Sequence, residues 1–481
     1  GAPVLFDNVA GNVALDFQFG DPDTVDIAFQ TAHHISRVDI RNNRIVVASM
    51  EPRSALAHYN NETDCFTMRL GCQGTFGMRN QLAGILNMER EKVRVLTENV
   101  GGSFGMKSFV YPEYICLLHA AKKLSRPVKW TEERSSSFLS DQQGRDHEVK
   151  GELALNKEGD FLAVRLFLHS NLGGYLAAVG PNMATNNMVK NITSVYKTPL
   201  IEINTKCVFT NTTPISAYRG AGRPEANYYM ERLIETAARE MGIDRMELRM
   251  RNHIRPDQIP YKAPSGQNYD SGNFPAILKN GLKFSNWENY EIRREISQKK
   301  GLLRGIGVSN YLEVTAPVET EMGGIRFEEN GDITIITGTL DYGQGHAAPF
   351  AQVLHSQLGV PFEKIRLLQG DSDELITGGG TGGSKSIMAS GGAIVEASIE
   401  VIKKAKQVAS HVFEAPIQDI EFHNGNLLVA GTDKSITLSE LSHKLKTEFI
   451  GVPDLPGTLD VKLNHGGVPS AFPNGCHVCE V

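Results

Sequence analysis

The residues that could carry chemistry lie in glycine-rich loops. The longest of these loops runs from Gly378 to Ser386 with the sequence GGGTGGSKS. It is predicted to follow a strand and to precede a helix, so its backbone N–H groups would point outwards and bind an anion. Ser384 and Ser386 would add two donors, and Lys385 would add a positive charge. The alternative is a flexible loop without a ligand.

Three further loops place polar side chains between glycines, each after a predicted strand. They are Gly71–Gly74 (GCQG), Gly101–Gly105 (GGSFG) and Tyr342–Gly345 (YGQG). Each loop alone is more typical of a turn than of a binding site. Glycine nevertheless makes up 47 of the 481 residues, above the usual ~7%. Four such loops in one chain favour a large, flat, anionic cofactor bound mainly by backbone donors.

Other cofactor and metal motifs are weak or absent in the sequence. The GxGxxG pattern within Gly378–Gly383 lacks the acidic residue that a nicotinamide-binding unit places after the next strand, so a nicotinamide-dependent dehydrogenase is the least favoured alternative. Cys476 and Cys479 form the only CxxC, which is more typical of two buried thiols than of a zinc or redox site. We therefore predict no metal site made of side chains.

Composition excludes several classes of protein. A net charge of −6 argues against a nucleic-acid or membrane-surface partner. No apolar stretch approaches the ~18 residues of a membrane span. The N-terminal residues have no features of a signal peptide, and six scattered cysteines form no disulfide framework. We expect a cytoplasmic protein that acts on a small molecule.

Strand and helix patterns alternate, which predicts an α+β fold with two large mixed α/β subdomains. The turn-rich stretch 255–274 is the best boundary, so we predict a first domain over 1–260, a linker region over 261–300 and a second domain over 301–481. No repeat of fixed period is visible. The predicted strands cover 65–70, 93–98, 127–131, 147–155, 161–169, 305–314, 332–338 and 364–368. The predicted helices cover 77–87, 111–124, 224–242, 347–358 and 384–413.

The octapeptide Ser216–Arg223 (SAYRGAGR) closely resembles the large subunit of the molybdenum hydroxylases, the family of xanthine dehydrogenase, aldehyde oxidase and carbon monoxide dehydrogenase. The resemblance covers nearly all the chain, because Met50–Arg53 (MEPR) and the four glycine-rich loops follow the family's order. It implies that both predicted domains bind a molybdenum cofactor. The family's metal is held by the dithiolene of a pterin and not by side chains, which accounts for the missing ligand motifs.

The resemblance also implies a role for each matching residue. Gln73 would donate a hydrogen bond to an oxygen on the molybdenum, Phe104 would wall the site, and Arg219 would place a cation near developing negative charge. Gly105 would let the cofactor approach the backbone, and Gln344 would bond the pterin. The cofactor's phosphates would be held by Gly383, Ser384 and Ser386.

The positions that would line the substrate pocket depart from the well-known members of the family. Ser108 and Asn187 stand where xanthine enzymes use a glutamate and an arginine to hold purine. Ala221 and Asn310 stand where those enzymes stack the substrate between two phenylalanines. Gly220 stands where carbon monoxide dehydrogenases have the cysteine that binds copper. A purine substrate is therefore not expected.

The resemblance implies a large-subunit portion that oxidises an aldehyde or N-heterocycle with oxygen from water. Electrons would pass to iron–sulfur and FAD subunits, in a dimer of heterotrimers, and the cofactor would be the cytosine dinucleotide form. The family's general base is a glutamate that we expect beyond residue 481, so the isolated chain should be inactive. The alternatives are a non-catalytic molybdopterin-binding or storage module and a carbon monoxide dehydrogenase-like large subunit.

Overall fold

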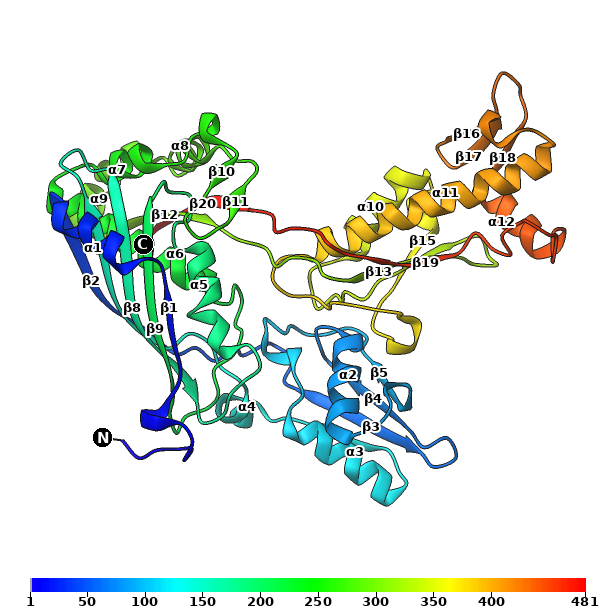
Figure 1. Ribbon diagram of the computed structural model, residues 1–481, viewed down its shortest axis with the longest axis horizontal. Helices are drawn as coiled ribbons and strands as arrows, with labels where there is room; N and C mark the ends of the chain where they lie inside the picture. The colour runs from blue at the N-terminus through cyan, green and yellow to red at the C-terminus, as the bar shows by residue number, and fades with distance from the viewer. Residues whose placement is uncertain (1) are drawn as a thin grey trace. The chain divides into compact units, whose positions relative to one another are not determined.

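The computed structural model describes residues 2–481 and divides into two compact units, each built from separated stretches of the chain (Figure 1). Unit 1 comprises the residues up to Val47 together with Phe138–Thr315 and Ser470–Val481, and unit 2 comprises Ala48–Ser137 and Ala316–Pro469. These units differ from the linear division predicted at residues 260 and 300. No described helix is both long and apolar enough to span a membrane.

Unit 1 is built on a five-stranded sheet in the order β1-β9-β8-β7-β2. Its strands are β1 (Val13–Phe19), β2 (His34–Asn42), β7 (His147–Leu155), β8 (Phe161–Gly173) and β9 (Leu200–Phe209). Neighbouring residues of β7 alternate between two cores, because successive side chains of a strand point to opposite faces. Leu153 packs in the large core with helix α6 (Arg223–Met241), and Ala154 packs with α1 (Pro22–Thr31). Helices therefore cover both faces.

The predicted helix 224–242 is confirmed as α6, and its ends follow from its sequence. Pro224 lies in the first turn, where its missing N–H costs nothing. Gly242 ends the helix with a φ of 66°, and its N–H bonds to the carbonyl of Ala238. Helix α6 follows directly after the SAYRGAGR segment, so the sheet of unit 1 fixes where that segment lies.

The predicted linker 261–300 is a structured part of unit 1. It contains the hairpin strands β10 (Tyr261–Lys262) and β11 (Asn268–Tyr269) and the helices α8 (Phe274–Phe284) and α9 (Tyr290–Lys299). Tyr269 and Phe274 are fully buried in the main core of the unit. The turn residues made the region resemble a linker, whereas the buried aromatic residues fix it to the core. The remaining elements of unit 1 are α5 (Asn186–Asn191), α7 (Arg245–Asn252), β12 (Ile306–Leu312) and β20 (Asn474–Glu480), and α4 (Arg134–Ser140) spans the boundary between the units.

Unit 2 contains one topology twice. The first copy begins with two antiparallel strands, which are followed by a helix and by a third strand that pairs parallel with the second. A second helix then leads to a fourth strand, which pairs antiparallel with the first. The elements of this copy are β3 (Ser54–Asn60), β4 (Cys65–Leu70), α2 (Thr75–Leu86), β5 (Val93–Leu96), α3 (Pro112–Leu124) and β6 (Val128–Thr131).

The second copy has the same strand order and the same parallel and antiparallel pairs. Its elements are β13 (Glu321–Phe327), β14 (Ile333–Ile336), α10 (Ala347–Leu358), β15 (Ile365–Leu368), α11 (Gly392–Phe413) and β19 (Val461–His465). Between α11 and β19 it also carries β16 (Ile420–His423), β17 (Asn426–Val429), β18 (Ser435–Thr437) and α12 (Leu438–Thr447). Because βαβ crossovers have one hand, the glycine-rich loops after β4 and β14 occupy equivalent places in the two copies, and so do the loops after β5 and β15.

The MEPR segment ends in a buried cation that joins β6 and α3 of the first copy. The side chain of Arg53 is 0% exposed and bonds to Glu132 at 2.7 Å and to Glu113 at 3.1 Å. Its guanidinium also lies 3.7 Å from the ring centroid of Tyr111. A buried charge of this kind is tolerated only while its partners are present.

Replacing Arg53 with alanine should lower the free energy of unfolding of unit 2 by about 3–5 kcal/mol, because two carboxylates lose their buried partner. Urea unfolding followed by Trp130 fluorescence, in a chain with Trp287→Phe, would measure the effect. The control is Arg69→Ala, whose exposed pair with Glu98 is worth at most about 1 kcal/mol. Equal losses in the two variants would contradict the prediction.

Candidate functional site

Gln73, in the loop between β4 and α2, has its side-chain amide fixed by hydrogen bonds. Its Oε1 accepts from the N–H of Gly105 at 2.8 Å and from the hydroxyl of Ser103. Because the N–H of Gly105 can only donate, this atom must be the oxygen, and the amide cannot flip. Nε2 donates one hydrogen to the carbonyl of Thr381 at 2.8 Å. The second Nε2 hydrogen has no partner in residues 2–481 and remains available to a ligand.

Thr381 joins three of the loops, although sequence reasoning gave it no role. Its N–H donates to the carbonyl of Gln73 at 2.7 Å, and its hydroxyl oxygen accepts from the N–H of Leu340 at 2.9 Å. The hydroxyl of Ser386 also lies 3.3 Å from that oxygen. The one signal in the sequence was a β-branched residue in the middle of a run of glycines.

Two close approaches of backbone explain why these loops are rich in glycine. A Cβ on Gly74 would lie 2.7 Å from Cα of Gly380, so the loops after β4 and β15 touch through their main chains. A Cβ on Gly383 would lie 2.6 Å from Cβ of Ala316, and Gly383 has a φ of 64°. Neither position tolerates a larger side chain without movement of the backbone.

The glycine-rich loop after β5 is held by Glu51, the glutamate of the MEPR segment. Its carboxylate Oε2 accepts from the N–H of Gly101 at 2.7 Å and from Lys107 at 2.8 Å. Phe104, in the same loop, has a φ of 52° and a side chain that is 39% exposed. A left-handed conformation in a bulky residue is strained, and such strain is concentrated at functional sites.

The loop after β14 is organised by Asp341. Its Oδ1 accepts from the N–H groups of Gly343, Gln344 and Gly345, and its Oδ2 accepts from His346 at 2.7 Å. Burial alone would raise the pKa of Asp341, but these bonds outweigh it and hold the pKa below its ordinary value. Gln344 itself is exposed, and within residues 2–481 its side chain is bonded only at Oε1, which accepts from the N–H of Tyr342 at 2.6 Å.

The SAYRGAGR segment forms a tight turn in unit 1. Ala221 has a φ of 51°, its N–H bonds to the carbonyl of Tyr218 at 2.7 Å, and its carbonyl accepts from Asn187 at 2.8 Å. The side chain of Arg219 is exposed and forms no ion pair within the described residues. Gly220 has a φ of 90°, and a Cβ there would lie 2.2 Å from Cγ of Pro224.

The predicted site residues therefore fall into two sets. Unit 2 contains Gln73, Phe104, Gly105, Ser108, Gln344, Gly383, Ser384 and Ser386, and unit 1 contains Asn187, Arg219, Gly220, Ala221 and Asn310. Ser108 is partly buried in the 3-10 turn Met106–Ser108. Asn310 lies on β12 with its Nδ2 bonded to the carbonyl of Gly475 at 3.4 Å. Asn310 makes no hydrogen bond to Ala221 or Asn187 in the described chain.

The cysteine prediction is wrong in one respect. Cys476 and Cys479 were expected to be two buried thiols, but Cys476 is partly exposed and Cys479 is exposed. Both lie on β20, where an odd separation places side chains on opposite faces. No cluster of metal-binding side chains occurs among residues 2–481.

A model of the molybdopterin cofactor-binding domain matches residues 5–253, and a second model with the same description matches residues 280–481. The chain belongs to the molybdopterin cofactor-binding family of the molybdenum hydroxylases. The chain is 30% identical to the 6-hydroxypseudooxynicotine dehydrogenase complex subunit gamma of Paenarthrobacter nicotinovorans, over 88% of this chain and 53% of that protein. It is 28% identical to the carbon monoxide dehydrogenase large chain of Hydrogenophaga pseudoflava, over 92% of this chain and 58% of that one.

Among solved structures, quinoline 2-oxidoreductase from Pseudomonas putida 86 superposes with a TM-score of 0.91 at 26% identity. The match covers 99% of this chain and 62% of the other. The α+β fold is thereby confirmed as that of a molybdenum hydroxylase large subunit. The chain spans a little over half the length of the curated relatives that it matches.

The loops of this molybdenum hydroxylase chain fit the family's cofactor. The free Nε2 hydrogen of Gln73 lies near Gly382, where a Cβ would be 3.8 Å from that nitrogen. The backbone N–H groups of Gly382 and Gly383 have no partner within residues 2–481. Fixed backbone donors beside a free amide are the donor set that a pterin with phosphates requires.

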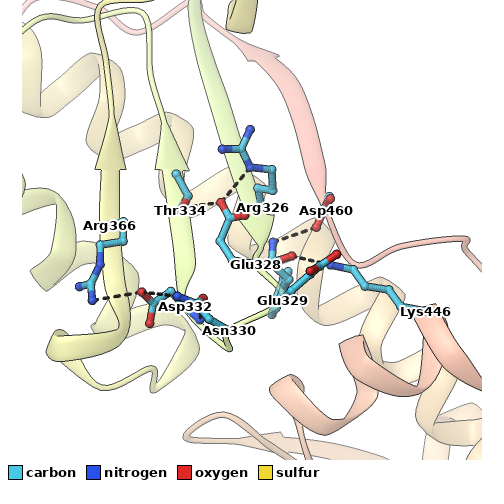
Figure 2. Close-up of a pocket in the computed structure, with 10 residues that line it drawn as sticks. Arg326, Glu328, Glu329, Asn330, Asp332, Thr334, Arg366, Lys446 and Asp460 are labelled. Atoms are coloured by element: carbon cyan, nitrogen blue, oxygen red, sulfur yellow. Dashed lines mark hydrogen bonds and ion pairs between the residues drawn. The ribbon is translucent and has the colours of Figure 1, made fainter. Parts of the chain in front are cut away.

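A polar surface pocket of about 590 Å³ lies elsewhere in unit 2 (Figure 2). Its cationic side chains are bonded to other side chains or to backbone: Arg366 pairs with Asp332 at 3.1 Å, and Arg326 pairs with Glu328 at 2.9 Å. Lys446 donates to the carbonyl of Phe327 at 2.6 Å. With its cations engaged in this way, the pocket does not offer the donors that the glycine-rich loops offer.

Replacing Thr381 with valine should destabilise unit 2 by about 1–3 kcal/mol, because the buried N–H of Leu340 loses its acceptor while the side-chain volume is kept. Thr381→Ser keeps the hydroxyl and should restore most of the loss. Thermal unfolding, together with hydrogen exchange at Leu340, would measure both. Equal behaviour of the valine and serine variants would show that the hydroxyl does not join the loops.

Proposed function

We propose that this chain is the cofactor-binding portion of a molybdenum hydroxylase large subunit and that its four glycine-rich loops hold a molybdopterin cofactor. The observation that carries the proposal is the amide of Gln73, whose orientation is fixed by Gly105 and Thr381 and whose remaining N–H is free. A fixed donor needs no reorganisation when a ligand oxygen arrives, and such preorganised donors are effective in catalysis.

When bound, the cofactor supplies the two-electron oxidation chemistry, and the chain supplies position and charge. Gln73 donates its free N–H to an oxygen of the cofactor, and Phe104 excludes water from one side. Gln344 offers its unbonded Nε2 to the pterin. Arg219 carries a positive charge that is not neutralised by any ion pair in the described chain, so it can stabilise negative charge on a substrate.

The loop 378–386 is proposed to bind the phosphates of the cofactor, in its cytosine dinucleotide form. The N–H groups of Gly382 and Gly383, the hydroxyls of Ser384 and Ser386, and the charge of Lys385 support this role. Electrons would leave through an iron–sulfur subunit and an FAD subunit, in a dimer of heterotrimers. Two relatives are named as a complex subunit and as a large chain, which supports an assembly of several chains.

The proposed substrate is a small organic molecule such as an aldehyde or an N-heterocycle, and not carbon monoxide. A copper site needs a soft thiolate ligand, and Gly220 has no side chain and no room for one beside Pro224. Cys72, next to Gln73, is no substitute. Its thiol is fully buried, lies 3.2 Å from the hydroxyl of Thr97, and has its pKa raised by burial. A similarity to quinoline 2-oxidoreductase supports an N-heterocycle.

Replacing Gly383 with leucine should abolish molybdenum retention, because a side chain there meets Ala316 and needs a φ of 64°. The matched control is Gly431→Leu, which has a φ of 74° but nothing within 4 Å. Molybdenum would be measured by elemental analysis of the protein purified with its native partner chains. Full molybdenum content in the Gly383 variant would contradict the proposed role of the loop.

The intact complex should contain no stoichiometric copper and should not oxidise carbon monoxide, and Cys72→Ser should change neither result. Copper analysis and a carbon monoxide-dependent dye-reduction assay would test this. Stoichiometric copper with carbon monoxide turnover would overturn the substrate assignment, and loss of both in the Cys72 variant would identify the ligand.

A further inference from the structure

Each copy of the duplicated topology of unit 2 has a glutamate near the start of its first strand. Glu51 precedes the first strand of the first copy and holds the loop after β5 through Gly101 and Lys107. Glu321 is the first residue of β13, the first strand of the second copy. Its Oε1 accepts from the N–H of Gly338 at 2.6 Å, just beyond the end of β14.

Glu321 also reaches the glycine-rich loop that follows β15. Gly338, whose N–H bonds to Glu321, packs against Gly378 of that loop, and the nearby N–H of Gly379 lowers the pKa of Glu321. Lys385 follows Gly379 at the same spacing at which Lys107 follows Gly101. The two lysines differ in one respect: Lys107 forms an ion pair at 2.8 Å, whereas Lys385 forms none within 4.0 Å in residues 2–481.

We propose that Glu321 is a positioning residue for the phosphate-binding loop: it fixes the backbone at Gly338, against which Gly378 of the loop packs, and leaves Lys385 without an ion pair, so that this lysine can face an anionic ligand. This inference rests on the proposed function and deepens it, because it adds a residue that the family motifs did not indicate. The segments that contain Gly338 and Gly378 are in tight contact, since a Cβ on Gly338 would lie 2.4 Å from Cα of Gly378. Without the carboxylate, the N–H of Gly338 at this contact and the N–H of Met322 would lose their acceptor.

The charge state of Glu321 is also linked to the ligand. Its side chain is fully buried, and Oε2 has no hydrogen-bond partner. Burial raises the pKa of Glu321 to about 7, against the opposing effects of the N–H groups of Met322, Gly338 and Gly379 and the charge of Lys385. The other titratable group opposite it is His465, its register partner on β19. A neutral Glu321 would not repel a phosphate, so the protonated form should favour binding.

Hydrogen exchange on the whole chain without cofactor tests the structural part of the proposal. Glu321→Ala should speed exchange at the N–H groups of Gly338 and Met322 by roughly tenfold or more, because both lose a buried acceptor. Glu321→Gln keeps an acceptor oxygen and should stay close to the wild type. The control is Glu319→Ala, an exposed residue of the same segment. Unchanged exchange in Glu321→Ala would overturn the proposal.

A pH series separates positioning from simple stability, even if the alanine variant folds poorly. The folded state holds the proton of Glu321 more tightly than the unfolded chain, so the stability that this proton contributes is lost as the pH rises from about 4.5 to about 7. The Tm of the wild type, relative to that of Glu321→Gln, should therefore fall over this range. Parallel pH profiles would overturn the proposed linkage.

Molybdenum retention in the native complex completes the test. Wild type should lose molybdenum faster at pH 8 than at pH 6, whereas Glu321→Gln, which is always neutral, should show little difference. Equal pH dependence in both would overturn the role of Glu321. Wild-type protein that never contains molybdenum would instead overturn the proposed function, and the exchange result would still decide whether Glu321 holds the loop.

Discussion

Gln73 and Thr381 bond to each other twice, once through the side chain of Gln73 and once through its main chain. The other features of the site in unit 2 depend on this contact. It fixes the loop after β4 against the loop after β15, where Gly74 and Gly380 touch without side chains between them. It also leaves a single amide hydrogen of Gln73 for a ligand. If either loop moved by an ångström, the free N–H would turn away and the backbone donors of Gly382 and Gly383 would move with it.

Few positively charged side chains near these loops are available to a ligand. Arg53 and Lys107 are buried in ion pairs that support the fold, whereas Lys385 forms no ion pair in the described chain. Most donors to a ligand are backbone N–H groups, which are neutral and already oriented. Burying such neutral donors avoids the desolvation cost of burying a full charge. They also discriminate between ligands by shape more than by charge. This arrangement suits a flat cofactor better than a freely diffusing anion.

The sequence identified the loops but not the groups that hold them. Runs of glycine marked the close approaches at Gly74, Gly380 and Gly383, because only glycine permits them. The anchoring roles of Glu51, Asp341 and Thr381 were hidden, since each acts on backbone N–H groups that are visible only in three dimensions. The duplication was hidden as well, because the two copies share little beyond the GQG-like loops and the glycine–lysine spacing.

Local sequence patterns otherwise predicted the structure correctly where the residues of a single element determine it, as at the two ends of α6. The same patterns were not sufficient where tertiary packing determines the structure. The stretch 261–300 has the composition of a linker, yet Tyr269 and Phe274 bury it in the core of unit 1. The spacing of Cys476 and Cys479 was interpreted without knowledge of the strand that carries them. Side chains alternate between the two faces of β20, so the two thiols lie on opposite faces.

The discontinuity of unit 2 has a consequence for the order of events during synthesis. Gln73 and Thr381 are 308 residues apart in sequence, so the ribosome completes the second partner long after the first. At roughly 5–20 residues per second, that interval is about 15–60 s. During this time the amide of Gln73 has its partners within the first copy, Gly105 and Ser103, but lacks the carbonyl of Thr381. The contact that joins the two copies of unit 2 can therefore form only after residue 381 has left the ribosome.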